Sequence, residues 1–341
     1  NGLINFKVLK KESETLLCKV LDGGKLGSKR HVNLPGVRIN LPSITSKDMD
    51  DINFGIKNKV DFIALSFVRD KEDLQKLQQI LNKKKSHAKI IAKIENQDGL
   101  DNINDICKFS WGVMVARGDL GIETSLTDLP NIQRKIMHAC AKWGRRSIVA
   151  THLLESMISN PTPTRAEVSD IANAIYEGAD AIMLSGETSI GKYPKECVQF
   201  LKSIAIKTEK FPTLGYEKNL ISTTDWEHIG VAAKNLAEAT NADGIIAITR
   251  TGNTATYVAN AKPNGIPIYT FTNNKDTYKK LSLVGSSYSY MIGSLKDHDK
   301  TLNKVIKILK NKYDKKTKLK FILASGIFSE EHSEAIQIIN I

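Results

Sequence analysis

The 341-residue sequence has only four cysteines, and no two of them have the spacing of a metal or redox motif. Their isolation argues against a disulfide framework and a zinc site, and it is typical of a reducing compartment. The chain also lacks an apolar run long enough to span a bilayer, and its first residues lack the basic start and apolar core of a signal peptide. We therefore expect a cytoplasmic protein without a membrane partner.

Acidic residues are fewer than basic ones: 37 Asp and Glu residues stand against 49 Lys and Arg residues, which gives a formal net charge of +12. The densest basic runs, at residues 83–85 and 310–320, contain no interleaved aromatic residues at base-stacking spacing. We interpret these runs as solvated surface and expect no nucleic-acid partner, although the positive field favours a small anionic substrate. The contents of 41% hydrophobic and 25% charged residues are ordinary for a soluble globular protein.

Short apolar runs alternate with amphipathic stretches through the middle of the chain. Their spacing of about 30 residues is the rhythm of a (β/α) barrel, and it predicts strands at residues 61–67, 89–95, 112–117, 146–151 and 180–185. Each predicted strand ends in polar residues, and barrel enzymes carry their catalytic groups at that end. Because closure of this barrel needs eight strands, the pattern predicts an α/β fold that contains five strands of a partial (β/α)8 TIM barrel.

Turn-forming residues and changes in the pattern of predicted elements divide the sequence into three units. Residues 1–39 form a hairpin-rich segment with strands expected at residues 3–9, 14–20 and 30–34. Residues 40–212 hold a helix at residues 43–57 and then the barrel strands. Residues 213–341 are expected to form an open, doubly wound α/β domain. Its elements are predicted as helices at residues 228–240 and 301–313, and strands at residues 244–249, 266–271, 288–292 and 319–324.

The strand at residues 89–95 carries a lysine and a glutamate within an apolar run. Side chains alternate along a strand, so Ile91, Lys93 and Glu95 share one face. In a covered parallel sheet an ammonium and a carboxylate are costly without partners, a metal or a substrate. Lys93 and Glu95 are therefore candidates for chemistry at the end of the strand. The alternative is an internal ion pair that only fixes the register of the strand.

The next strand ends in a second candidate group, Gly118 and Asp119. Backbone amides at this turn could face a substrate anion while the carboxylate faces a cation. Neighbouring strands of a parallel barrel would bring Glu95 and Asp119 together, so that both could bind one hard divalent ion, Mg²⁺ or Mn²⁺, with substrate oxygens completing its shell. The alternative is a simple turn into a helix, where Gly and Asp are common.

Two later segments are weaker signals when each is considered alone. Thr151 places a hydroxyl at the end of a strand, immediately before an expected helix. Residues 161–170 form a rigid turn followed by a helix start, for which a loop with an N-cap is the simpler interpretation.

The order of these motifs strongly resembles the pyruvate kinase family. The motifs that carry the resemblance are SKRHVNLPG at residues 28–36, ALSFVR at 64–69, IAKIEN at 91–96, MVARGDLG at 114–121, ATHLLESM at 150–157, PTPTRAEVSD at 161–170 and MLSGET at 183–188. The resemblance implies transfer of the phosphoryl group of phosphoenolpyruvate to ADP, giving pyruvate and ATP. It also implies a catalytic barrel, of which residues 40–212 are the C-terminal part, a small β lid that ends within residues 1–39, and a C-terminal regulatory or oligomerisation domain.

The resemblance assigns roles to the candidate residues. Lys93 would stabilise charge on the transferring phosphoryl group and the enolate, and Glu95 and Asp119 would be the Mg²⁺ ligands. Gly118 and Asp119 would also contact the substrate through backbone amides, and Thr151 would lie beside the carbon that is protonated. In the lid, Arg30 matches the basic residue near the nucleotide, and the family is usually a homotetramer. Phosphoryl transfer depends mainly on positioning and charge neutralisation, which a metal and one lysine supply.

The sequence also departs from the family pattern. Three barrel strands, most of the lid, the K⁺ ligands and the phosphate-binding arginine would precede residue 1, so K⁺ is expected only by resemblance and we expect the chain to be part of a longer one. His152 stands where the family commonly has glutamine. Two other classes are alternatives to the kinase: a non-catalytic homologue acting as a regulatory or oligomerising subunit, and a Mg²⁺-dependent, enolate-forming barrel lyase.

The C-terminal unit matches the family more loosely. The loop with Thr249, Thr251, Gly252, Asn253 and Thr254 follows a predicted strand, opens a helix and aligns with the family's effector-phosphate loop. The later loop at residues 325–332 is acidic where effector-binding members carry glycines and basic residues. We therefore expect weak or absent activation by fructose 1,6-bisphosphate.

Overall fold

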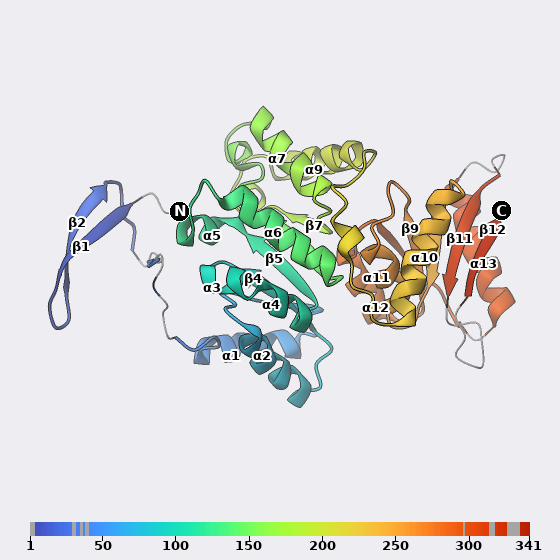
Figure 1. The fold of residues 1–341 in the computed structure, drawn as a ribbon, viewed down its shortest axis with the longest axis horizontal. Helices are drawn as coiled ribbons and strands as arrows, with labels where there is room; N and C mark the ends of the chain where they lie inside the picture. The colour runs from blue at the N-terminus through green and yellow to red at the C-terminus, as the bar shows by residue number, and fades with distance from the viewer. Residues whose placement is uncertain are drawn as a thin grey trace.

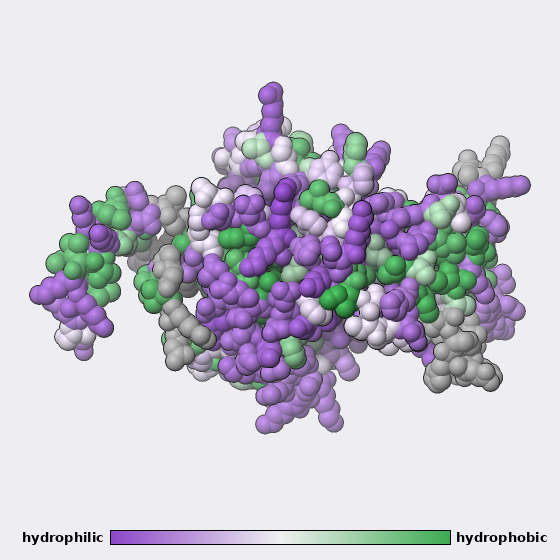
Figure 2. Space-filling model, viewed as in Figure 1, coloured by the Kyte–Doolittle hydropathy of each residue, from purple (hydrophilic) through white to green (hydrophobic). Residues whose placement is uncertain are grey.

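The computed structural model describes residues 4–28, 32–34, 37, 41–295, 297–313, 318–325 and 335–341, and within them the strands form three sheets (Figure 1). The first sheet is an antiparallel hairpin of β1 (Asn5–Lys11) and β2 (Leu16–Asp22) that projects from the rest of the molecule. Its apolar residues are exposed, and Figure 2 shows hydrophobic surface on it. In the described part of the chain, no helix is both long and apolar enough to cross a membrane.

The second sheet confirms the five predicted parallel strands. Its order is β3-β4-β5-β6-β7, and adjacent strands run parallel. The strands are β3 (Phe62–Leu65), β4 (Lys89–Ile94), β5 (Gly112–Ala116), β6 (Arg146–Ala150) and β7 (Ala181–Met183). Each ends one or two residues before the predicted end, because the residues there belong to the loops or, for Arg117, to the helix that follows.

Helices and short 3-10 turns precede, connect and follow these strands. They are α1 (Ser46–Lys57), α2 (Lys71–Lys83), α3 (Gln97–Asp101), α4 (Ile103–Phe109), α5 (Arg117–Glu123), α6 (Leu129–Lys142), η1 (Glu155–Ile158), α7 (Arg165–Tyr176), α8 (Gly186–Ser189), α9 (Pro194–Thr208) and η2 (Tyr216–Asn219). Helix α1 begins three residues later than predicted, because Thr45 and Asp48 form a capping box at its start.

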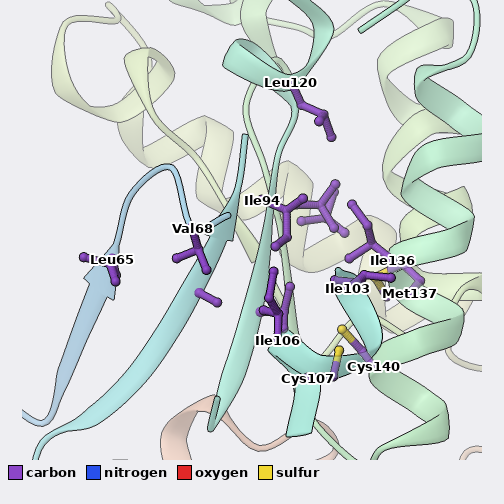
Figure 3. Close-up of a cluster of buried hydrophobic side chains, with 14 of the residues drawn as sticks. Leu65, Val68, Ile94, Ile103, Ile106, Cys107, Leu120, Ile136, Met137 and Cys140 are labelled. Carbon is purple, nitrogen blue, oxygen red and sulfur yellow. The ribbon is translucent and has the colours of Figure 1, made fainter. Parts of the chain in front are cut away.

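The apolar runs of this sheet bury side chains on both faces. In β4, Ile90, Ala92 and Ile94 pack in the core beneath the helices, part of which is drawn in Figure 3. Ile91 instead packs with Met114 and other residues on the opposite face. A strand that is buried on both faces reads as a continuous apolar run, which is why Lys93 stood out in the sequence.

The third sheet has the order β10-β9-β8-β11-β12. Its unit contains α10 (Asp225–Ala239), β8 (Gly244–Ile248), α11 (Asn253–Asn260), β9 (Ile268–Thr272), α12 (Lys275–Lys280), η3 (Leu281–Leu283), β10 (Ser287–Met291), α13 (His298–Lys312), β11 (Lys320–Ser325) and β12 (Ala335–Asn340). Helices α10 and α11 cover one face and α13 covers the other, as expected of a doubly wound sheet. The antiparallel edge strand β12 was not predicted.

A buried polar cluster joins the second and third sheets, and we call it the junction. Asp180, which precedes β7, accepts hydrogen bonds at Oδ1 from Arg146 Nη1 at 3.1 Å, Lys262 Nζ at 2.7 Å and Gly285 N at 3.2 Å. Arg146 Nη2 also donates to Asn260 Oδ1. Arg146 and Asp180 belong to the second-sheet unit, whereas the other three residues belong to the third, so the junction fixes one unit against the other.

Candidate active site

The candidate residues lie at one edge of the second sheet. Strand β4 pairs with β5 through Lys93 and Met114, and β5 pairs with β6 through Ala116 and Ala150. Because the strands are parallel, their carboxyl ends meet at one edge, which places Glu95, Asp119 and Thr151 just beyond three consecutive strands. The structure thus brings the candidates from the three motifs to one edge.

Lys93 is held between two oxygen atoms. Its Nζ lies 2.8 Å from Glu95 Oε1 and donates to Ser66 Oγ at 2.9 Å. The internal ion pair considered from the sequence therefore exists. The two side chains nevertheless differ in exposure, because Glu95 is 2% exposed and Lys93 is 24% exposed. The ammonium group is fixed by its partners and still open to a ligand on its exposed side.

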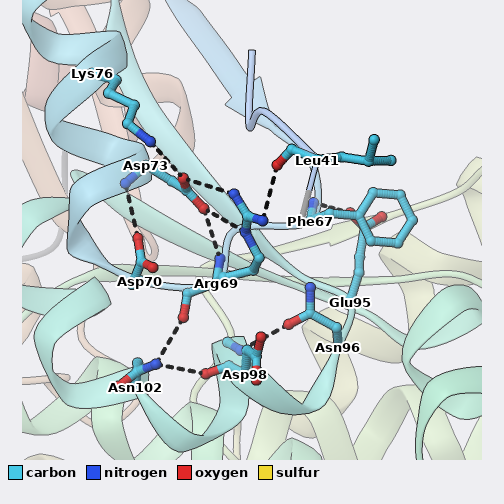
Figure 4. Close-up of polar contacts among 11 residues, drawn as sticks. Leu41, Phe67, Arg69, Asp70, Asp73, Lys76, Glu95, Asn96, Asp98 and Asn102 are labelled. Carbon is cyan, nitrogen blue, oxygen red and sulfur yellow. Dashed lines mark hydrogen bonds and ion pairs between the residues drawn. The ribbon is translucent and has the colours of Figure 1, made fainter. Parts of the chain in front are cut away.

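Glu95 also orders the loop that follows β3. Its Oε2 accepts a hydrogen bond from the backbone N of Phe67 at 2.7 Å, and the two residues lie together in Figure 4. Phe67 has a φ of 51°, which is unusual for an aromatic residue, and Val68 N donates to Lys93 O at 3.3 Å. The carboxylate that pairs with Lys93 thus also ties down the chain next to Ser66. The sequence carried no signal for the conformation of Phe67.

An ion-pair network fixes the far end of this loop (Figure 4). Arg69 makes two hydrogen bonds to Asp73, from Nε at 3.1 Å and from Nη2 at 3.2 Å, and Asn102 Nδ2 donates to Arg69 O at 2.9 Å. Burial alone would raise the pKa of Asp73, but the hydrogen bonds from Arg69 and its positive charge hold that pKa below its ordinary value. The buried carboxylate is therefore a stable anchor for the segment that carries Ser66.

Asp119 lies in the first turn of α5 and is half-buried. Within the described residues, its carboxylate makes no hydrogen bond or ion pair. No group of three or more His, Cys, Asp and Glu side chains that could hold a metal is found in the described part of the chain. Glu95 and Asp119 follow adjacent strands, and they are of the ligand type that Mg²⁺ takes from proteins, one or two carboxylates with water and substrate phosphate oxygens completing the shell.

Thr151 and His152 both have positive φ, at 77° and 55°. The carbonyl oxygen of Thr151 accepts hydrogen bonds from Arg117 Nε at 3.1 Å and from Arg117 Nη2 at 2.6 Å. Gly118 lies against the threonine, since a Cβ atom added to Gly118 would be 3.0 Å from Thr151 Cγ2. The side chain of His152 is exposed. Sequence reasoning missed the side chain of Arg117, because a bond to a backbone carbonyl 34 positions away leaves no local pattern.

The remaining predicted residues lie elsewhere or cannot be placed. Arg30 lies outside the described residues, as do residues 326–332 of the acidic loop. The loop with Thr249, Thr251, Gly252, Asn253 and Thr254 follows β8, next to β11, where the strand order of the third sheet reverses. Gly252 has a φ of 94°, and its N donates to Thr249 Oγ1 at 2.9 Å. Ligands of doubly wound sheets bind at such reversals.

Comparison with known proteins places these features in a family. The family model described as pyruvate kinase, barrel domain, matches residues 1–198, and that described as pyruvate kinase, alpha/beta domain, matches residues 227–339. The pyruvate kinase of Staphylococcus epidermidis is 41% identical over 312 residues, and that of Staphylococcus saprophyticus is 42% identical over 313 residues. Each alignment covers 90% of this chain and 53% of the relative, so the chain spans about half the length of these relatives.

A solved structure agrees with these matches. The crystal structure of a pyruvate kinase from Cryptosporidium parvum superposes with a TM-score of 0.91 at 31% sequence identity. The superposition covers 99% of this chain and 70% of that chain. Both sheets that were predicted from the sequence therefore have counterparts in one known architecture.

Proposed function

The chain belongs to the pyruvate kinase family, and we propose that the full-length protein transfers the phosphoryl group of phosphoenolpyruvate to ADP, giving pyruvate and ATP. The observation that carries the proposal is the arrangement around Lys93. Its ammonium is oriented by Ser66 and Glu95 and remains partly exposed, while the carboxylate of Asp119 stands at the end of the adjacent strand. This combination suits phosphoryl transfer, which needs positioning and charge neutralisation more than covalent help.

Lys93 would bind the phosphoryl oxygens and stabilise negative charge as it develops on the enolate. An ammonium that is held in place before the reaction acts without reorganisation, which makes such electrostatic stabilisation effective. The 2.8 Å contact with Glu95 and the hydrogen bond to Ser66 hold the ammonium group in place. Oriented in this way, Lys93 is the proposed catalytic residue for phosphoryl transfer.

Glu95 and Asp119 would hold Mg²⁺ or Mn²⁺, and a bound ion would neutralise charge on the phosphoryl and enolate oxygens. Backbone amides of Gly118 and Asp119 would orient the substrate. We also expect a K⁺ requirement, which rests on family membership alone. Arg30 is proposed to lie near the nucleotide.

Thr151 would act in the second half of the reaction. The enolate of pyruvate must gain one proton at its methylene carbon, which forms a C–H bond and breaks an O–H bond of the donor. The hydroxyl of Thr151, directly or through water, is the proposed source, and solvent returns the proton to the donor. Thr151 suits this role because it is half-buried at the sheet edge and its hydroxyl has no hydrogen-bond partner within the described residues.

We further propose the three-unit division at residues 1–39, 40–212 and 213–341, a homotetramer and a cytoplasmic location. The loop with Thr249, Thr251, Gly252, Asn253 and Thr254 is proposed to bind the phosphate of an effector. These proposals rest on family membership and on the position of the loop at the strand-order reversal of the third sheet.

The test is pyruvate formation by the full-length protein, coupled to reduction of the product, with Mg²⁺, K⁺, phosphoenolpyruvate and ADP. Lys93→Met should lower kcat by about a hundredfold or more, the scale of losing one preorganised electrostatic group. The matched control is Lys89→Met, because Lys89 is exposed at the start of the same strand and should tolerate the change. A folded wild-type protein without turnover would support the non-catalytic homologue, and pyruvate formation without ADP would support a lyase.

A further inference from the structure

The backbone at Thr151 adopts a conformation that its own sequence does not favour. A φ of 77° is a genuine outlier for a β-branched residue, and His152 follows with a φ of 55°. Such conformations persist only when the surrounding structure imposes them. The contacts that impose this one are therefore part of how the Thr151 hydroxyl is presented at the sheet edge.

Arg117 supplies these contacts from the start of α5. Its guanidinium donates twice to Thr151 O, at 3.1 and 2.6 Å, and once to Ala150 O at 3.3 Å. Its other side is fixed by Asp170 Oδ1 at 2.8 Å and by Gln133 Oε1 at 3.4 Å. Arg117 is only 8% exposed. The planar fork of arginine can bind both sets of acceptors at once, whereas the single ammonium of lysine cannot reproduce this geometry.

Gly118 restricts the threonine side chain from the other direction. The methyl carbon of Thr151 packs against Gly118 so closely that a Cβ atom added to Gly118 would lie only 3.0 Å from it. The methyl group is therefore packed and the carbonyl is held by Arg117, while the hydroxyl makes no hydrogen bond within the described part of the chain. The methyl group and the carbonyl of Thr151 are thus fixed, and the hydroxyl is left for the substrate.

We propose that Arg117 is a positioning residue that acts on the protonation step through Thr151, an inference that rests on the proposed function. It holds the carbonyl of Thr151 so that the hydroxyl faces the methylene carbon of the enolate. Asp170 in turn holds Arg117, so a change at Asp170 should affect the same step more weakly.

The experiment measures the two half-reactions separately in the full-length protein. Exchange of the methyl protons of pyruvate with D₂O, followed by NMR with Mg²⁺ and ATP present, reports protonation and its reverse. Arg117→Lys should slow this exchange by about tenfold. This is less than the full rate contribution of a general acid, because the Thr151 hydroxyl is still present and only its position changes. The substitution should leave the KM for phosphoenolpyruvate unchanged. Arg134→Lys is the control, because Arg134 also pairs with a carboxylate, Glu177 at 3.4 Å, and should not affect exchange.

A double-mutant cycle separates positioning from general stabilisation. If Arg117 acts through Thr151, Thr151→Ala should slow exchange more than Arg117→Lys, and the double variant should be no slower than Thr151→Ala alone. Losses that multiply in the double variant, or unchanged exchange in Arg117→Lys, would overturn the inference. If Arg117→Lys does not fold, Asp170→Asn replaces it, with a smaller loss of exchange expected and unchanged exchange again overturning the inference. Failure of the wild-type protein to form pyruvate would instead contradict the proposed function.

Discussion

Removing the charge of Asp180 is expected to weaken the junction between the second and third sheets. The carboxylate is 1% exposed, and Arg146, Lys262 and the backbone N of Gly285 all donate to its Oδ1. Asp180→Asn keeps the shape of the side chain and removes its charge. Arg146, whose side chain is 2% exposed, would then be buried without a countercharge.

The size of the effect follows from burial. Breaking a buried ion pair by removing one partner costs about 3–5 kcal/mol, because the other charge is left uncompensated. Lys262 is 16% exposed and can recruit water, whereas Arg146 cannot. We therefore expect the lower part of this range, about 3 kcal/mol of unfolding free energy at neutral pH. That is a large share of the typical total for a protein, about 5–15 kcal/mol.

The loss of unfolding free energy in Asp180→Asn should also depend on pH. Burial alone would raise the pKa of Asp180, but the charges of Arg146 and Lys262 hold it below its ordinary value. A carboxyl whose pKa is lowered on folding contributes stability above its unfolded pKa, about 3.9, and loses that contribution as the pH falls through its folded pKa. The difference between wild type and Asp180→Asn should therefore be constant near neutrality and narrow below about pH 4.

The assay is equilibrium unfolding in urea, followed by circular dichroism and by tryptophan fluorescence. Trp111 packs against core residues of both units and is a suitable reporter. Asp105→Asn is the matched control. Asp105 forms an exposed ion pair with Lys108 at 2.9 Å, and removing this pair should not measurably change the unfolding free energy. An Asp180→Asn protein as stable as wild type, or a difference that does not narrow in acid, would refute the reasoning.

Four further outcomes are expected. Gly230→Ala should destabilise the C-terminal unit by about 1–3 kcal/mol in urea unfolding, because the new Cβ would lie 2.6 Å from the carbonyl carbon of Tyr257. Gly118→Ala should lower kcat by about tenfold or more in the pyruvate assay, because its Cβ would displace Thr151. Removing divalent ions with EDTA should abolish turnover, and Mg²⁺ should restore it. Fructose 1,6-bisphosphate should leave the KM for phosphoenolpyruvate unchanged, and a clear fall in that KM would contradict the expectation from the acidic loop.

Much of the fold could be predicted because its signals are local. Strands β3 to β7 are short apolar runs, and both sheet faces are covered, so their spacing was enough to identify them. The edge strand β12 was missed: it is antiparallel, pairs only with β11, and its side chains are exposed or half-buried, so it lacks the continuous apolar run that marked the buried strands. The junction was also missed, since Asp180 and Lys262 are 82 positions apart and neither lies in a motif.

The candidate site likewise contains residues with a local sequence signal and residues without one. Lys93, Glu95 and Asp119 could be proposed as candidates because a charged side chain at or beyond the end of an apolar strand is conspicuous, and parallel pairing brings adjacent strand ends together. Arg117 also ends an apolar strand, but nothing in the sequence shows that its fork faces the carbonyl of Thr151. Charges could be located from the pattern, whereas their orientation depended on tertiary contacts.

Strand β6 connects the junction with Thr151. Arg146, its first residue, belongs to the junction, and Thr151 follows its last residue. At about 3.3 Å per residue the two ends lie roughly 15 Å apart, on opposite edges of the sheet. In barrels these edges serve stability and catalysis separately. Asp180→Asn should therefore lower stability without slowing exchange of the pyruvate methyl protons. If exchange slowed in proportion to the lost stability, the junction would have to act on Thr151 along β6.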